Sequence, residues 1–100
     1  MLSAEKTNPD ILPLMLEELE DKPEAVGARL QKVREIMGLS KKEFAERAGR
    51  SEQVYGPFEN ARRELSLQSA KRLRKAYSLP LDFMYFGKID DLPTRISRDL

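Results

Sequence analysis

Gly49 lies between two short segments that each begin with a helix cap, and this pattern constrains the fold of the chain more than any other. Ser40 opens the capping-box pattern Ser-Lys-Lys-Glu, and Ser51 is a second cap directly after the glycine. Ala45, four residues before Gly49, is small enough for a second helix to cross there. A tight turn between crossing helices favours the left-handed backbone that glycine adopts at the lowest cost. Residues 41–60 are therefore predicted to form two helices that cross at a tight turn.

Apolar residues at helical spacing predict three further helices around this pair. They cover residues 23–37, 66–77 and 81–86, and Gly38 and Gly87 end the first and the last of them. Since no stretch alternates apolar and polar residues over a useful length, the prediction is an all-α fold of five helices. The side chains expected to face the core are Val26, Leu30, Val33, Met37, Phe44, Ala45, Ala48, Tyr55, Phe58, Leu67, Ala70, Leu73, Tyr77, Leu81, Phe83, Met84 and Phe86.

Two arms flank the expected domain at residues 25–87. The N-terminal arm, residues 1–24, is acidic, and its Asn-Pro pair at positions 8 and 9 is typical of a helix start. A short amphipathic helix is predicted near residues 9–20, with its apolar stripe formed by Ile11, Leu12, Met15, Leu16 and Leu19. The C-terminal tail, residues 88–100, is a candidate dimerisation segment.

Composition excludes several classes of function. One hundred residues fit one domain, and the chain has no Cys and no His, which excludes disulfides, thiolate chemistry, the usual zinc sites and a histidine base. No apolar run is long enough to cross a membrane, and no secretory signal is visible, so a cytoplasmic protein is expected. No metal site and no cofactor is predicted.

Charge is segregated along the chain although the net charge is only +1. Residues 29–75 hold 13 Lys and Arg against 6 Asp and Glu, whereas residues 1–25 hold 2 against 7. A basic middle with an acidic arm suits a polyanion such as DNA or RNA, and the alternative is charge that is merely scattered over solvated helices.

Several motifs, in order, resemble the lambda-repressor and Cro-like family, also called the xenobiotic-response-element type. Residues 39–45 (Leu-Ser-Lys-Lys-Glu-Phe-Ala) resemble its "Leu-Ser-Gln-x-Glu-Leu-Ala" segment. Residues 59–63 (Glu-Asn-Ala-Arg-Arg) resemble "Glu-Asn-Gly-Lys-Arg", and residues 66–67 and 81–84 resemble the starts of the fourth and fifth helices. The resemblance covers about residues 26–87 and implies a compact five-helix, lambda-repressor-like DNA-binding domain.

The resemblance also implies roles for individual residues. The helix over residues 52–59 would enter the major groove with its first turn facing the bases, and residues 40–41 and 62–63 would contact phosphates. For the two loop arginines, an ordinary solvated loop is the alternative. Arg34 and Glu59 match a structural ion pair between the first and third helices of the family. The implied DNA-binding residues are Ser40, Lys41, Arg50, Glu52, Gln53, Val54, Arg62 and Arg63.

Four positions depart from the family pattern. Gly56 and Pro57 lie inside the expected recognition helix, where a proline costs about 3 kcal/mol and a glycine about 1 kcal/mol, so a kink or a tightened turn is expected. Ala61 replaces a glycine, which predicts strain at the helix exit. Pro80 replaces a capping Ser or Thr.

Two hypotheses for function remain open at this point. The first is a sequence-specific DNA-binding transcriptional regulator, repressor-like, that acts as a homodimer through residues 83–86 and 92–100. The second is a protein-interaction module on the same scaffold, antiactivator- or antitoxin-like. It would bind another regulatory protein through the acidic helix before residue 22 (residues 9–21) or through a kinked third helix. An enzyme is not expected, because the sequence has no glycine-rich phosphate loop and its carboxylates are not spaced as in a catalytic site.

Overall fold

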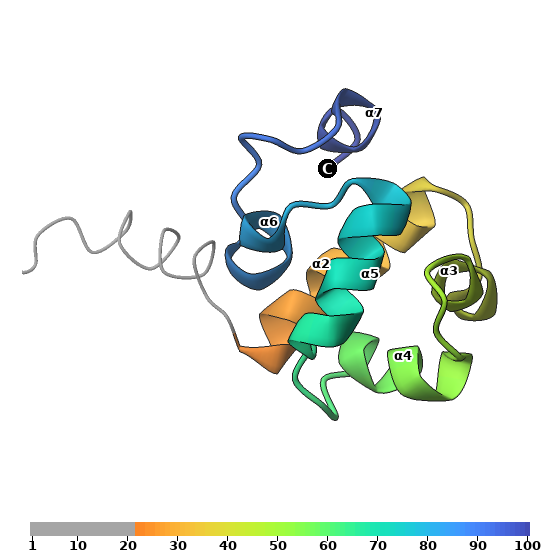
Figure 1. The fold of residues 1–100 in the computed structure, drawn as a ribbon. Coiled ribbons are helices and arrows are strands. Elements are labelled where there is room, and N and C mark those ends of the chain that lie inside the picture. Colours follow the sequence, from red (N-terminus) through yellow and green to blue (C-terminus); the bar gives the residue numbers. More distant parts are fainter. Residues whose placement is uncertain (1–21) are drawn as a thin grey trace, which may run out of the picture.

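The computed structural model describes residues 22–100, which form six helices and no strand (Figure 1). The helices are α2 (Pro23–Ile36), α3 (Lys41–Arg47), α4 (Glu52–Glu59), α5 (Leu67–Tyr77), α6 (Leu81–Phe86) and α7 (Thr94–Ser97). The predicted all-α class is thus confirmed, and α2 to α6 correspond to the five expected helices. The helix expected near residues 9–20 lies outside the described residues.

Local caps explain where these helices begin. Ser40 and Glu43 form the expected capping box: the Ser40 hydroxyl accepts from the Glu43 N–H at 3.1 Å, and the Glu43 carboxylate accepts from the Ser40 N–H at 2.9 Å. The hydroxyls of Ser51 and Ser66 accept backbone N–H groups at the starts of α4 and α5. Pro80 occupies the cap of α6 without a side-chain hydrogen bond.

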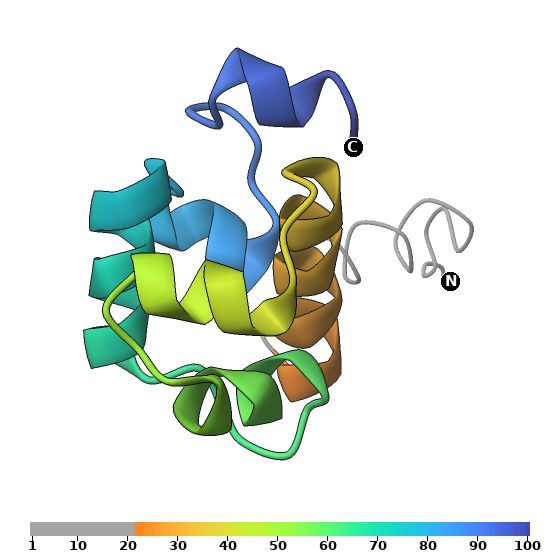
Figure 2. The ribbon, with the colours of Figure 1, turned by 90° about the vertical axis from the view of Figure 1, so that its right-hand side faces the viewer.

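The core forms where α2 packs against α4 and α6, α3 against α4, and α5 against α6 (Figure 2). Its centre is aromatic: the Phe44 ring stacks on Tyr77 with centroids 4.4 Å apart and lies tilted against Tyr55 at 5.2 Å. The Tyr77 hydroxyl also donates to the Phe44 carbonyl at 2.8 Å, which links α5 to α3. Phe44 therefore connects the helix pair around Gly49 to the rest of the molecule.

Two residues expected in the core are exposed instead. Leu67 is 54% exposed, because the buried face of α5 follows Ser69, Leu73 and Tyr77, and Leu67 lies at the rim of that face. Phe86 is 41% exposed: it follows the buried Phe83 by three residues but Met84 by only two, which places it at the edge of the buried face of α6. Both predictions were wrong for the same reason: the apolar stripe of each helix is wider than the face that packs against the neighbouring helices.

The C-terminal tail packs on the domain through α7, which the sequence analysis did not predict. Leu92 and Ile96 are buried in the core together with Phe83 and Met84 of α6. These four side chains, which were expected within dimerisation segments, are covered by their own chain. In both views α7 lies at the opposite end of the molecule from α4 (Figures 1 and 2).

Candidate nucleic-acid interface

The turn between α3 and α4 has the geometry expected from the sequence. Gly49 has a φ of +75°, in the left-handed region, and the N–H of Arg50 donates to the Ala45 carbonyl at 2.9 Å. Ala45 is fully buried, so no side-chain bulk separates the two helices at their crossing. This turn leaves the first turn of α4, with Glu52, Gln53 and Val54, exposed on the surface.

A buried polar cluster positions the other end of α4. The Glu59 carboxylate accepts from Nε of Arg34 at 2.7 Å and from the Tyr55 hydroxyl at 2.6 Å. Arg34 also donates to the Leu39 carbonyl at 2.9 Å, which connects α2, the following loop and α4. The hydrogen bond to Glu59 raises the pKa of Arg34, and burial together with the same carboxylate raises the pKa of Tyr55 far above its ordinary value. The Arg34 guanidinium and the Tyr55 hydroxyl thus both donate to the Glu59 carboxylate, and this cluster holds α4 against α2.

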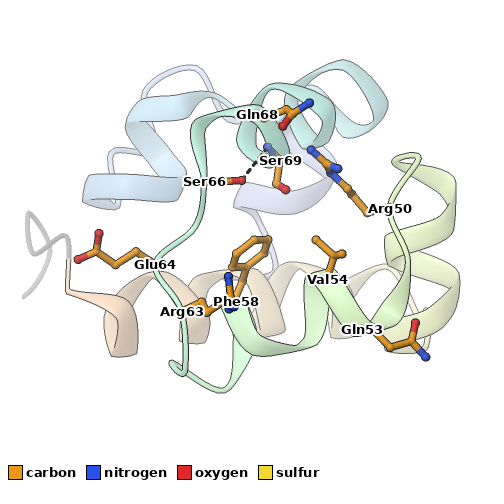
Figure 3. A pocket seen from close by; sticks show the side chains of 9 residues that line it. All are labelled: Arg50, Gln53, Val54, Phe58, Arg63, Glu64, Ser66, Gln68 and Ser69. Carbon is orange, nitrogen blue, oxygen red and sulfur yellow. Dashed lines mark hydrogen bonds between the residues drawn. The ribbon is translucent and has the colours of Figure 1, made fainter.

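A groove of about 660 Å³ opens between α4 and the start of α5 (Figure 3). Four of the predicted DNA-binding residues, Arg50, Gln53, Val54 and Arg63, line it. Arg50, Gln53 and Val54 are close in sequence, and the loop after α4 adds Arg63 to them.

The other four predicted residues lie outside this groove. Glu52 and Arg62 are exposed, and Lys41 is half-buried at the first position of α3. Ser40 is exposed, but its hydroxyl and its N–H are both used by the capping box. Ser40 and Lys41 were both expected to hold a phosphate at the start of α3. Of the two, only Lys41 has a side chain that takes no part in the capping box.

Five residues that line the groove were not predicted, namely Phe58, Glu64, Ser66, Gln68 and Ser69. Three of them belong to the start of α5, where Ser66 caps the helix and Ser69 is its third residue. Ser69 is only 2% exposed, and its hydroxyl oxygen has no hydrogen-bond partner among the described residues. Nε of Arg50, on the same groove, is also buried without a partner there. The sequence placed Ser66 only at the start of a helix, and nothing in it singled out Ser69.

Pro57 lies inside α4, and the helix continues past it to Glu59. The carbonyl of Pro57 accepts the N–H groups of Arg62 at 2.9 Å and Arg63 at 3.2 Å, so the residue also shapes the loop that carries both arginines. Ala61 has a φ of +65°, which confirms the expected strain at the helix exit. A hydrogen bond holds the far end of the loop against α6: the Tyr85 hydroxyl donates to the Leu65 carbonyl at 2.6 Å.

Other kinds of site find no support within residues 22–100. No group of three or more acidic side chains in this part of the chain is arranged to hold a metal ion. No helix in the same part is long and apolar enough to cross a membrane.

Comparison with known proteins agrees with this geometry. The family model described as helix-turn-helix matches residues 30–84, which is more than half of the chain. The matched segment runs from α2 to α6 and includes the whole groove between α4 and α5. Among curated proteins and among solved structures, none matches the chain.

Proposed function

Because the chain belongs to the helix-turn-helix family of the lambda-repressor and Cro type, which places it among DNA-binding regulators, we propose that it reads a specific DNA sequence through the first turn of α4. Gln53 and Val54 support this proposal, since both are exposed at the start of α4. The Gln53 amide has the donor and acceptor pattern for adenine, and Val54 offers an apolar surface for a thymine methyl. Glu52 on the same turn has an acceptor for cytosine N4.

The groove beside α4 is the single observation that carries the proposal. It places cationic side chains, Arg50 and Arg63, next to the two base-reading candidates. Lys41 at the start of α3 and Arg62 in the loop after α4 are further cations of the neighbouring segments. This combination is what DNA recognition requires, because phosphate contacts set the position of the protein and base contacts select the sequence.

A phosphate oxygen in this groove would also satisfy the unpartnered groups around it. The hydroxyl of Ser69 and Nε of Arg50 are both donors, and both are buried without a partner among the described residues. The first turn of α5, an eleven-residue helix, adds the partial positive charge of a helix N-terminus. We therefore assign a backbone phosphate of the bound duplex to this position.

A homodimer on a palindromic site and a repressing role are part of the proposal. Two copies would present two α4 helices to successive major grooves about 34 Å apart. The contact between the copies has to come from exposed side chains such as Phe86, since Phe83, Met84, Leu92 and Ile96 are buried. Sedimentation of the protein alone and on a palindromic duplex tests whether two copies associate.

Two substitutions separate base reading from phosphate binding. On a duplex selected from a random-sequence pool, we expect Gln53→Ala to lose about 1–3 kcal/mol of binding free energy and to relax the preference at one base pair. Arg63→Ala should weaken selected and random duplexes about equally, because a phosphate contact carries no sequence information. Lys88→Ala, which removes an exposed cation distant in sequence from α3 to α5, is the matched control and should change neither. Equal losses on both duplexes for Gln53→Ala would contradict the placement of α4 in the major groove.

A further inference from the structure

A second, apolar groove of about 480 Å³ lies between α2 and the C-terminal part of the chain. One wall is the α2 stripe Ala25, Ala28 and Lys32, with Arg29 beside it, and the other includes Phe83, Ile89 and Leu100. Ile89 and Leu100 are 56% and 48% exposed. A further element that covered these exposed apolar side chains would be stabilised by their removal from water.

The α2 wall suits a helix. Ala25, Ala28 and Lys32 recur at helical spacing, so they form one continuous face of α2. Two alanines on this face allow the backbone of a second helix to approach closely. Arg29 and Lys32 add positive charge along the wall, and Arg29 keeps its place by donating to the Met84 carbonyl at 3.2 Å.

The sequence that precedes α2 has the complementary chemistry. Residues 1–21 hold six Asp and Glu against one Lys. Near residues 9–20 the apolar side chains recur at helical spacing, from Ile11 through Met15 to Leu19, and Glu18 and Glu20 flank the stripe on a helical projection. An apolar face with acidic flanks matches an apolar groove with cationic residues in its wall.

Connectivity favours this segment over any partner in solution. The segment ends at Asp21, Lys22 is the N-cap of α2, and the groove begins at Ala25 in the first turn of that helix. A docking partner joined through so short a link has an effective concentration on the order of millimolar. A helix over residues 9–20 would be about 18 Å long, enough to follow the stripe from Ala25 to Lys32.

We propose that the apolar groove between α2 and the C-terminal part of the chain is the docking site of the chain's own acidic segment, residues 9–21. Docked there, the segment covers Ile89 and Leu100 and pairs its carboxylates with the cations of α2. It also holds these acidic groups away from α3 and α4. This inference does not depend on the proposed DNA binding, because it concerns a different surface.

A paramagnetic label on the full-length chain tests the docking. The chain has no cysteine, so Glu17→Cys, off the apolar stripe, gives a single site for a nitroxide. We expect the backbone amide signals of Ala28 and Ile89 to broaden most, and those of Gln53 and Gln68 beside the other groove to broaden least.

Two exposed apolar residues provide a matched pair of variants. Ile89→Asp places a carboxylate in the groove and should abolish the selective broadening, whereas Leu67→Asp, at a nearly equal exposure of 54% but outside the groove, should leave it unchanged. Because both side chains are exposed, both variants should keep the dispersed amide spectrum of the folded protein.

Three results would overturn the proposal. Broadening that is strongest at Gln53 would place the segment on the DNA-binding surface, and the absence of selective broadening would leave the groove without this occupant. A nitroxide-labelled chain that broadens Ala28 of an isotope-labelled, nitroxide-free chain would show that a second copy fills the groove.

Discussion

Within residues 22–100, two residues that are not glycine have a strained backbone. Among the described residues, Ala61 has a φ of +65° after α4, and Ser78 has a φ of +59° after α5. A side chain in the left-handed region costs roughly 1–2 kcal/mol, because Cβ approaches the following carbonyl oxygen. Both residues sit where a helix must end, so the core packing of α4 and α5 outweighs this cost.

We expect Ala61→Gly to raise the free energy of unfolding by about 1 kcal/mol, because glycine relieves the contact at Cβ. Urea denaturation of the two proteins measures the difference. Ala76→Gly is the control: Ala76 lies exposed in the last turn of α5, where the same change should lower the stability by up to about 1 kcal/mol. A loss of stability in both variants would mean that Ala61 is not strained.

At the scale of helices, the crossing of α2 and α4 depends on one glycine that the sequence analysis did not single out. A Cβ on Gly27 would meet the carbonyl oxygen of Glu59 and lie 2.7 Å from that of Phe58. A Cβ on Gly56, inside α4, would meet nothing within 4 Å. The two glycines therefore have opposite roles, although both lie within helices.

Gly27→Ala should lower the free energy of unfolding by roughly 1–3 kcal/mol, because the contacted atoms are backbone and the helices must move apart. Gly56→Ala should raise it by about 1 kcal/mol, since alanine favours the helix and has room. Thermal or urea denaturation of the two variants shows whether each change raises or lowers the free energy of unfolding. Similar effects for the two variants would contradict the close approach of α2 to α4.

Pro57 is a second residue that destabilises α4. Having no N–H, it cannot donate to the carbonyl of Gln53, and a proline inside a helix costs about 3 kcal/mol or more. We expect Pro57→Ala to raise the free energy of unfolding by up to about 3 kcal/mol and to retain DNA binding, because Gln53 and Val54 precede the proline. A variant that is more stable but no longer selective for sequence would show that the proline aims the first turn of α4.

At the scale of the whole molecule, charge is segregated along the sequence. The basic residues of the segment 29–75 include Arg50 and Arg63 on the groove beside α4, whereas the acidic residues are concentrated in the sequence before residue 22. A surface of this kind attracts a polyanion even though the net charge is only +1.

DNA affinity should therefore fall steeply with salt. Each phosphate that the protein neutralises contributes a slope of about −0.9 to a plot of log affinity against log salt concentration. We expect a slope that corresponds to several phosphates, and a shallower slope, by about one contact, for Arg63→Ala. Titration of duplex DNA at a series of salt concentrations measures both. A slope near zero would contradict the phosphate contacts assigned to the groove.

The sequence alone determined the helices of the domain, because the signals for them act within a few residues. Ser40, Ser51 and Ser66 accept N–H groups three residues ahead, and Gly49 holds a positive φ at a turn of neighbouring residues. The same kind of local pattern predicted the family and the exposed first turn of α4.

The tertiary structure alone decided what residues far apart in the sequence do to one another. The role of Gly27 depends on the carbonyl groups of α4, and the groove joins Gln53 to the start of α5. The burial of Ile96 depends on a surface formed by other helices. An apolar stripe shows that a helix has a buried face. The width of that face depends on the neighbouring helices that cover it. For this reason Leu67 is exposed at the start of α5, whereas the hydroxyl of Ser69 is buried.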